Sequence, residues 1–111
     1  MKGYDLVAIN PDKKISVRVQ VKSRWRTKAN GFIINNFDCD FVVIVLLNRG
    51  EKGSKVEALP PAYYVVPVED VLALPRNKDW GKVRFSQFPD FQSYRDRWDL
   101  IRETLKMSGE L

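Results

Sequence analysis

A chain of 111 residues, 44% of them hydrophobic and 30% charged, has the size and composition of one small globular domain, so we expect a single domain over residues 1–111. Its net charge of +5 favours acidic partners, and the absence of histidine excludes histidine-based catalytic triads and histidine-bound metal sites. The single cysteine, Cys39, excludes an internal disulfide and a multi-cysteine zinc site, and its expected role is that of a small apolar residue.

Two strands joined by a tight turn are predicted at the start of the chain. Residues 4–9 form a short strand candidate, and residues 11–14 have the composition of a turn, because proline fixes its own backbone angle and Asp tolerates tight bends. From Ile15 to Lys22, apolar residues hold every odd position and polar residues every even position. This two-residue period predicts a strand with one buried face.

The middle of the chain predicts further strands around a buried centre. Residues 24–30 read as a loop and residues 31–35 as a short strand, while the continuous apolar run of residues 41–47 predicts a central strand buried on both faces. That run is the longest apolar stretch and has seven residues, far fewer than the roughly 20 that a membrane helix needs. Since no charged and then apolar leader opens the sequence, we expect a cytoplasmic protein without membrane association.

A strand and two helical segments are predicted in the second half. Residues 48–61 contain two Gly and two Pro and read as an exposed connection to a strand at residues 62–66, followed by helical turns at residues 68–74. Residues 80–88 fit no single pattern. An amphipathic helix is predicted over residues 93–106, because apolar side chains recur around it at spacings of three or four. We interpret this stripe as part of the core and not as a base-stacking platform. Its members are Phe91, Tyr94, Trp98, Ile101 and Leu105.

Positive charge is concentrated in the first quarter of the chain. Residues 1–28 contain eight basic and two acidic residues, whereas the rest contains eleven basic and twelve acidic residues. Lysine and arginine gathered in this way suit a phosphate backbone, whose counterions they release on binding, although such a surface also serves solubility alone. The candidate nucleic-acid contacts in this segment are Lys13, Lys14, Arg18, Ser23, Arg24, Trp25, Arg26 and Lys28.

Three polar side chains are expected to converge on one face of the first two strands. If the turn consists of residues 11–14, the antiparallel register sets Asp5 directly opposite Gln20, and Lys22 lies two positions further along the same face. Carboxylate and amide oxygens suit hard cations such as magnesium, and a nearby lysine can orient water or offset phosphate charge. The alternative is an ordinary amphipathic strand with a solvated polar face.

This arrangement resembles a known nuclease signature. Gly3-Tyr4-Asp5-Leu6, followed about fifteen residues later by Val19-Gln20-Val21-Lys22-Ser23, resembles the D-x(n)-(D/E/Q)-x-K motif of the PD-(D/E)XK, or restriction-endonuclease-like, nucleases. The order of strand, turn, strand with the x-K element and buried strand beginning at Asp40 is similar to that of Holliday-junction resolvases and related small nucleases. The resemblance covers residues 3 to 70.

The resemblance implies a fold and a set of site residues. It implies an α/β domain with a mixed central sheet of four or five strands and a C-terminal amphipathic helix, without the helix that relatives place before the first strand. It further implies Mg²⁺ or Mn²⁺ held by Asp5, by the Gln20 side chain and by the backbone carbonyl of Val21. Lys22 would then contact the attacking water, and Ser23 would contact a phosphate. Gln20 departs from the acidic residue usual in the family, so the site has one negative charge fewer.

The expected function is metal-dependent hydrolysis of phosphodiester bonds, in DNA, with Asp5, Gln20 and Lys22 as the catalytic residues. The alternatives are a catalytically inactive nucleic-acid-binding module of the same fold and a small interaction subunit. We also expect a homodimer, because the predicted helix can cover only one face of the sheet and the other would remain apolar and exposed. The alternative is that residues 68–88 fold back and cover that face of the sheet.

Overall fold

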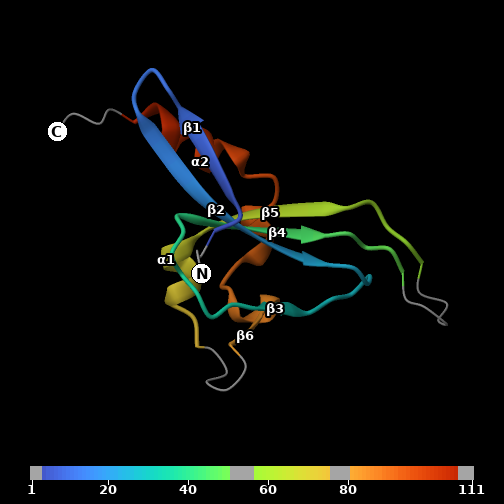
Figure 1. The fold of residues 1–111 in the computed structure, drawn as a ribbon. Coiled ribbons are helices and arrows are strands. Elements are labelled where there is room, and N and C mark those ends of the chain that lie inside the picture. Colours follow the sequence, from blue (N-terminus) through green and yellow to red (C-terminus); the bar gives the residue numbers. More distant parts are fainter. Residues whose placement is uncertain (1–3, 51–56, 76–80, 108–111) are drawn as a thin grey trace.

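In the computed structural model, which describes residues 4–50, 57–75 and 81–107, the first two strands form the predicted hairpin (Figure 1). Strand β1 (Leu6–Asn10) pairs antiparallel with β2 (Ile15–Arg24), and Asn10 lies opposite Ile15. The four residues between them form the turn, in which the Asn10 side-chain oxygen accepts the Asp12 N–H at 3.2 Å. The predicted register is therefore confirmed.

The main sheet has four strands and mixed directions. Strand β4 (Phe41–Leu46) lies parallel to β2, and β5 (Ala62–Pro67) lies antiparallel to β4, so the strand order is β1-β2-β4-β5. This confirms the small α/β fold with a mixed four-stranded sheet and the central position of the apolar strand.

Strand β4 is buried on both of its faces, because its side chains alternate between two apolar clusters. Phe41 and Val43 pack with Val17, Val19 and Val65 on one face. On the other face, Val42 and Ile44 pack in the larger cluster, whose buried members include Phe32, Ile34, Cys39, Tyr64, Val66, Val71, Val83 and Phe88. A sheet of this kind needs a cover on each side.

The C-terminal helix α2 (Trp98–Lys106) covers the first of these faces (Figure 1). Its residues Leu100, Ile101 and Leu105 pack against the smaller cluster. The end of the helix is tied to the β1–β2 turn, since the Asn10 side chain donates to the Leu105 carbonyl at 2.7 Å and the Lys13 ammonium donates to the Lys106 carbonyl. In the described part of the chain, no helix is long and apolar enough to span a membrane.

The second face is covered by segments that follow β5 and by a short ribbon. Helix α1 (Val68–Leu72) confirms the predicted helical turns and buries Val71. Two short 3-10 helices, η1 (Phe85–Gln87) and η2 (Phe91–Tyr94), add a row of stacked aromatic rings. The Tyr94 hydroxyl donates to Asp70 at 2.8 Å, and burial together with this hydrogen bond raises the pKa of Tyr94 to about 12.

This cover removes the reason given above for a homodimer. The face that was expected to remain exposed is covered by described parts of residues 68–75 and 81–94, in line with the alternative that residues 68–88 fold back over it. The surface that stays open is instead an apolar groove of about 560 Å³ on the α2 face, beside Leu6, Val21, Val45, Tyr63 and Trp98. The homodimer stays a prediction, but an uncovered second face of the sheet no longer supports it.

The predicted helix over residues 93–106 was wrong at its beginning. The chain crosses from one face of the sheet to the other at Asp96, which has a φ of +53° and ends any continuous helix. There the Asp96 N–H donates to the Tyr63 carbonyl at 2.9 Å, and Arg95 bridges to Tyr64. The crossing thus follows the outer edge of β5 and satisfies part of that edge.

The aromatic stripe is divided by this crossing. Phe91 and Tyr94 belong to the larger cluster on one face of the sheet, whereas Ile101 and Leu105 belong to the smaller cluster on the other. Helical spacing alone had placed all of them on one face. The reading of the stripe as core is confirmed for these four residues.

The predicted strand over residues 31–35 does not join the main sheet. Strand β3 (Gly31–Ile33) pairs antiparallel with β6 (Lys82–Arg84) as a separate two-stranded ribbon. The pairing requires glycine at position 31, because a β-carbon there would lie 2.1 Å from the Val83 carbonyl oxygen. The ambiguous segment near residue 80 therefore contains the partner strand, and Trp80 itself lies outside the described residues.

The two-sided burial of β4 predicts a large difference between two isoleucines. Ile44 is fully buried, whereas Ile9 on β1 is 64% exposed. Ile44→Ala should lower the free energy of unfolding by about 2–5 kcal/mol through lost burial and a cavity, and the matched Ile9→Ala by only about 0.5 kcal/mol. Urea denaturation of the two variants measures both values, and equal losses would contradict the assignment of β4 to the centre of the fold.

Candidate functional site

Asp5 is held at the beginning of β1 by two hydrogen bonds to β2. Its N–H donates to the Val19 carbonyl at 2.8 Å, and its carboxylate oxygen Oδ2 accepts the Val21 N–H at 2.7 Å. The carboxylate thus replaces the main-chain acceptor that a longer β1 would offer to Val21. Asp5 is exposed, so its second oxygen remains open to a ligand.

Gln20 and Lys22 share one face of β2, and Asp5 lies just before the β1–β2 ladder. The ladder begins with Leu6 opposite Val19, and Asp5 is held beside it by the bonds to the Val19 carbonyl and the Val21 N–H. Because side chains alternate along a strand, Lys22 projects from the same face as Gln20. Gln20 and Lys22 thus share a face as predicted, and the Asp5 carboxylate reaches the main chain of β2 at Val21, whereas the convergence of all three side chains stays a prediction.

Gln20 contains a buried oxygen with no hydrogen-bond partner. Its side-chain oxygen Oε1 is the one buried side-chain polar atom without a partner among the described residues. Such an atom costs roughly 1–3 kcal/mol relative to a satisfied one, so a native protein usually has a reason to keep it. A ligand that accepts the lone pairs of this oxygen removes the cost.

The Val21 carbonyl points toward the same edge. Successive carbonyls of a strand point to alternate sides, and the Val19 carbonyl accepts the N–H of Asp5. The Val21 carbonyl therefore faces the β1 side as well, next to the Asp5 carboxylate that accepts the Val21 N–H. The site offers one carboxylate, one amide oxygen and one carbonyl oxygen.

Oxygens of these three kinds are the ligands that a hard divalent cation such as magnesium takes, together with several waters. The negative charge that they supply is low, since Asp5 is the sole carboxylate of the set. In the part of the chain that the structure describes, no group of three or more Asp, Glu, His or Cys residues could hold a metal ion. Any affinity must therefore come from a mixed set of ligands.

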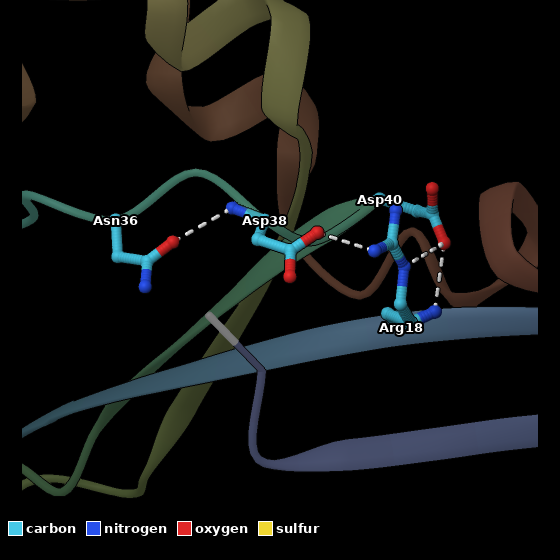
Figure 2. A network of polar contacts seen from close by, with 4 residues as sticks. All are labelled: Arg18, Asn36, Asp38 and Asp40. Atoms are coloured by element: carbon cyan, nitrogen blue, oxygen red, sulfur yellow. Dashed lines mark hydrogen bonds and ion pairs between the residues drawn. The ribbon is translucent and has the colours of Figure 1, made fainter. Parts of the chain in front are cut away.

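Two nearby carboxylates are committed to a structural network with Arg18 (Figure 2). The Arg18 guanidinium forms ion pairs with Asp38 and Asp40, and its backbone N–H donates to the Asp40 carboxylate at 2.8 Å. Burial alone lowers the pKa of Arg18, but the two carboxylates more than offset it and hold that pKa above its usual range. The network ties β2 to the segment before β4, and Arg18 presents no uncompensated charge to a phosphate.

The predicted basic surface is divided between the two ends of β2. Lys13 and Lys14 lie in the β1–β2 turn, where Lys13 is bonded to the end of α2. Arg24 ends β2, nine residues after Ile15, which corresponds to about 30 Å of strand. Ser23 projects from the face opposite that of Lys22, so it does not join Lys22 at a phosphate.

The loop after β2 exposes its tryptophan and buries a threonine. Trp25 is 63% exposed, and the Arg49 guanidinium lies 5.6 Å from the centre of its ring. The buried Thr27 instead anchors the loop: its hydroxyl accepts the Gly50 N–H at 2.8 Å and donates to the Glu57 carbonyl at 2.9 Å. Arg24, Arg26 and Lys28 lie within three residues of this exposed indole in the sequence.

Two basic residues near this loop were missed by the sequence analysis. Lys82 and Arg84 lie on β6, and burial, followed by the charges of Arg24, Arg84 and Arg26, lowers the pKa of Lys82. The segment was ambiguous because a strand of three residues shows too little alternation to be recognised. Its pairing with β3 would have identified it as a strand, but pairing between segments so far apart in the chain cannot be recognised in a single sequence.

Comparison of the chain with protein-family models, with curated proteins and with solved structures found no match.

The Arg18 network predicts unequal effects for its two carboxylates. Asp40→Ala leaves the partly buried Arg18 N–H without its acceptor and should lower the free energy of unfolding by about 1–3 kcal/mol. Asp38→Ala removes only an exposed ion pair and should cost less than about 1 kcal/mol. Urea denaturation tests this order, and a larger loss for Asp38→Ala would show that the ion pair, not the backbone hydrogen bond, holds the segment.

Proposed function

We propose that this chain is a metal-dependent nuclease with a restriction-endonuclease-like fold, which hydrolyses phosphodiester bonds in DNA. The resemblance to the PD-(D/E)XK motif supports the family, and the hydrogen bond that holds the Asp5 carboxylate at Val21, next to Gln20 in the chain, supports the site. The observation that carries the proposal is the buried Gln20 oxygen without a partner among the described residues, on the same face of β2 as Lys22.

In this proposal, each residue of the site has one task. Asp5, Gln20 Oε1 and the Val21 carbonyl hold Mg²⁺ or Mn²⁺, which supplies positive charge against a phosphodiester and lowers the pKa of water. The Lys22 ammonium, half-buried beside Gln20, orients the attacking water and offsets charge that develops on the phosphate. The Val21 N–H fixes the Asp5 carboxylate in place.

The loop after β2 gives the nucleic acid a place beside this site. Arg24 follows Lys22 on the same face of β2, and neither residue forms an ion pair among the described residues. The exposed Trp25 can stack on a base, a contact worth about 1–3 kcal/mol. Arg26 and Lys28 add positive charge in the same loop.

The rival function is a nucleic-acid-binding module of the same fold that has lost catalysis. The observation in its favour is the low charge of the site, since Gln20 stands where an acid is usual and Arg18 occupies both Asp38 and Asp40. Metal binding separates the two functions, because the module needs none.

We expect isothermal titration calorimetry to detect Mg²⁺ or Mn²⁺ binding that depends on Asp5. Asp5→Asn retains an oxygen that can accept the Val21 N–H but removes the only negative charge, so affinity should fall by about tenfold or more. Asp12→Asn is the matched control, because Asp12 is exposed in the β1–β2 turn, and its variant should bind as the wild type does.

Absence of metal binding to the wild-type protein would favour the rival module. Equal losses in Asp5→Asn and Asp12→Asn would mean that the protein attracts cations only through its general charge, and the proposed site would then be abandoned.

Restoring the acid at position 20 should strengthen the site. Gln20→Glu adds a second carboxylate to the same oxygen position, so affinity for Mg²⁺ should rise by about tenfold. Without metal, the added charge faces burial and the neighbouring Asp5, so the variant should unfold more easily than the wild type. Thermal unfolding with and without Mg²⁺ measures both effects. If Mg²⁺ does not change the stability of the variant, residue 20 does not contact the ion.

A further inference from the structure

The β3–β6 ribbon presents two positive side chains on its outer face. In the ribbon Phe32 lies opposite Val83, and both are fully buried against the larger apolar cluster. The neighbouring positions on β6, Lys82 and Arg84, therefore project from the other side of the ribbon.

These two residues line a polar pocket of about 280 Å³ together with Ser86 and Gln87. Gln87 forms a fixed wall, since its Oε1 accepts the Arg84 N–H at 2.7 Å and its Nε2 donates to the Pro75 carbonyl at 2.9 Å. The Arg84 guanidinium and the Ser86 hydroxyl form no hydrogen bond or ion pair with any described residue. Donors without acceptors line a pocket of sufficient size for a phosphate group.

Positive charge gathers around the pocket. Burial lowers the pKa of Lys82, and among the described residues three arginines, Arg24, Arg84 and Arg26, lower it further. Lys82 donates one hydrogen bond, of 3.2 Å, to the Asn30 side-chain oxygen, which is neutral. An anion in this position relieves the mutual repulsion of the basic groups.

We propose that the pocket of Lys82, Arg84 and Ser86 binds an internal phosphate of a nucleic-acid backbone. Together with Arg24 on β2, it extends the contact surface from the hairpin to the β3–β6 ribbon. This inference rests on the proposed function for its ligand, but it does not require the metal or catalysis. It also provides the charge that the divided basic surface lacks near the site.

The test is the salt dependence of DNA binding without divalent metal. Fluorescence anisotropy with a short labelled duplex DNA, in EDTA and at several KCl concentrations, gives the slope of log K against log salt. Lys82→Gln with Arg84→Gln should weaken binding and reduce the magnitude of the slope by about one, for the one phosphate contact that the pocket loses. The control, Arg102→Gln with Lys106→Gln, removes two exposed charges from α2 on the opposite face of the sheet and should leave the slope near the wild-type value.

A slope that is unchanged in Lys82→Gln with Arg84→Gln, or that falls equally in the control, would overturn the pocket. Duplexes with a 5′-phosphate and with a 5′-hydroxyl should bind equally, and a requirement for the terminal phosphate would overturn the assignment to an internal one. Far-ultraviolet circular dichroism checks that each variant is folded.

Failure of the pocket and failure of the proposed nuclease function give different results. Loss of slope in the pocket variant with no Mg²⁺ binding to the wild type would support the pocket and the inactive module. Asp5-dependent Mg²⁺ binding with an unchanged slope would support the metal site and reject the pocket.

Discussion

The burial of β4 on both faces is the constraint from which the rest of the structure follows. Phe41 and Val43 point into one apolar cluster, and Val42 and Ile44 point into the other, so neither face of the sheet can be left to water. The chain supplies both covers itself: α1, the ribbon and the two 3-10 helices on one side, and α2 on the other. To do so it must pass around an edge of the sheet, and it passes at β5, where Asp96 adopts a left-handed conformation.

The same constraint places the candidate site. β2 pairs with β4 along one edge and with β1 along the other, so its polar even-numbered positions are carried partly into the protein. The charge of Arg18 is balanced there by two carboxylates, whereas the side-chain oxygen of Gln20 has no hydrogen-bond partner among the described residues. An unsatisfied group in an otherwise well-paired structure is where a functional requirement is expected to oppose stability. The metal site and the nucleic-acid surface that we propose would use one strand, the first at its middle and the second at its end.

Much of the hairpin and of the central sheet could be predicted from the sequence. The alternation from Ile15 to Lys22 and the composition of the turn were sufficient for the register from Asn10 opposite Ile15 to Leu6 opposite Val19, because both are local patterns. The uniform apolar character of residues 41–46 was sufficient for the central strand. These predictions depend only on residues close in sequence or on burial on both faces.

What could not be predicted depends on contacts between distant residues. Helical spacing joins Phe91 to Leu105 in one stripe, and only the edge of β5 explains why the chain turns at Asp96. The commitment of Arg18 to Asp38 and Asp40 required the parallel pairing of β2 with β4. The pocket of Lys82 and Arg84 required the pairing of β3 with β6, and the exposure of Trp25 followed from Thr27 acting as the anchor.

The central claim is that Asp5, Gln20 and Val21 hold a divalent cation. A crystal structure of the protein soaked in Mn²⁺, with an anomalous difference map, tests it most directly. The account predicts a peak about 2.0–2.2 Å from the Asp5 carboxylate, from Gln20 Oε1 and from the Val21 carbonyl oxygen. A map with no peak there, or with Mn²⁺ bound only at other carboxylates, would contradict it.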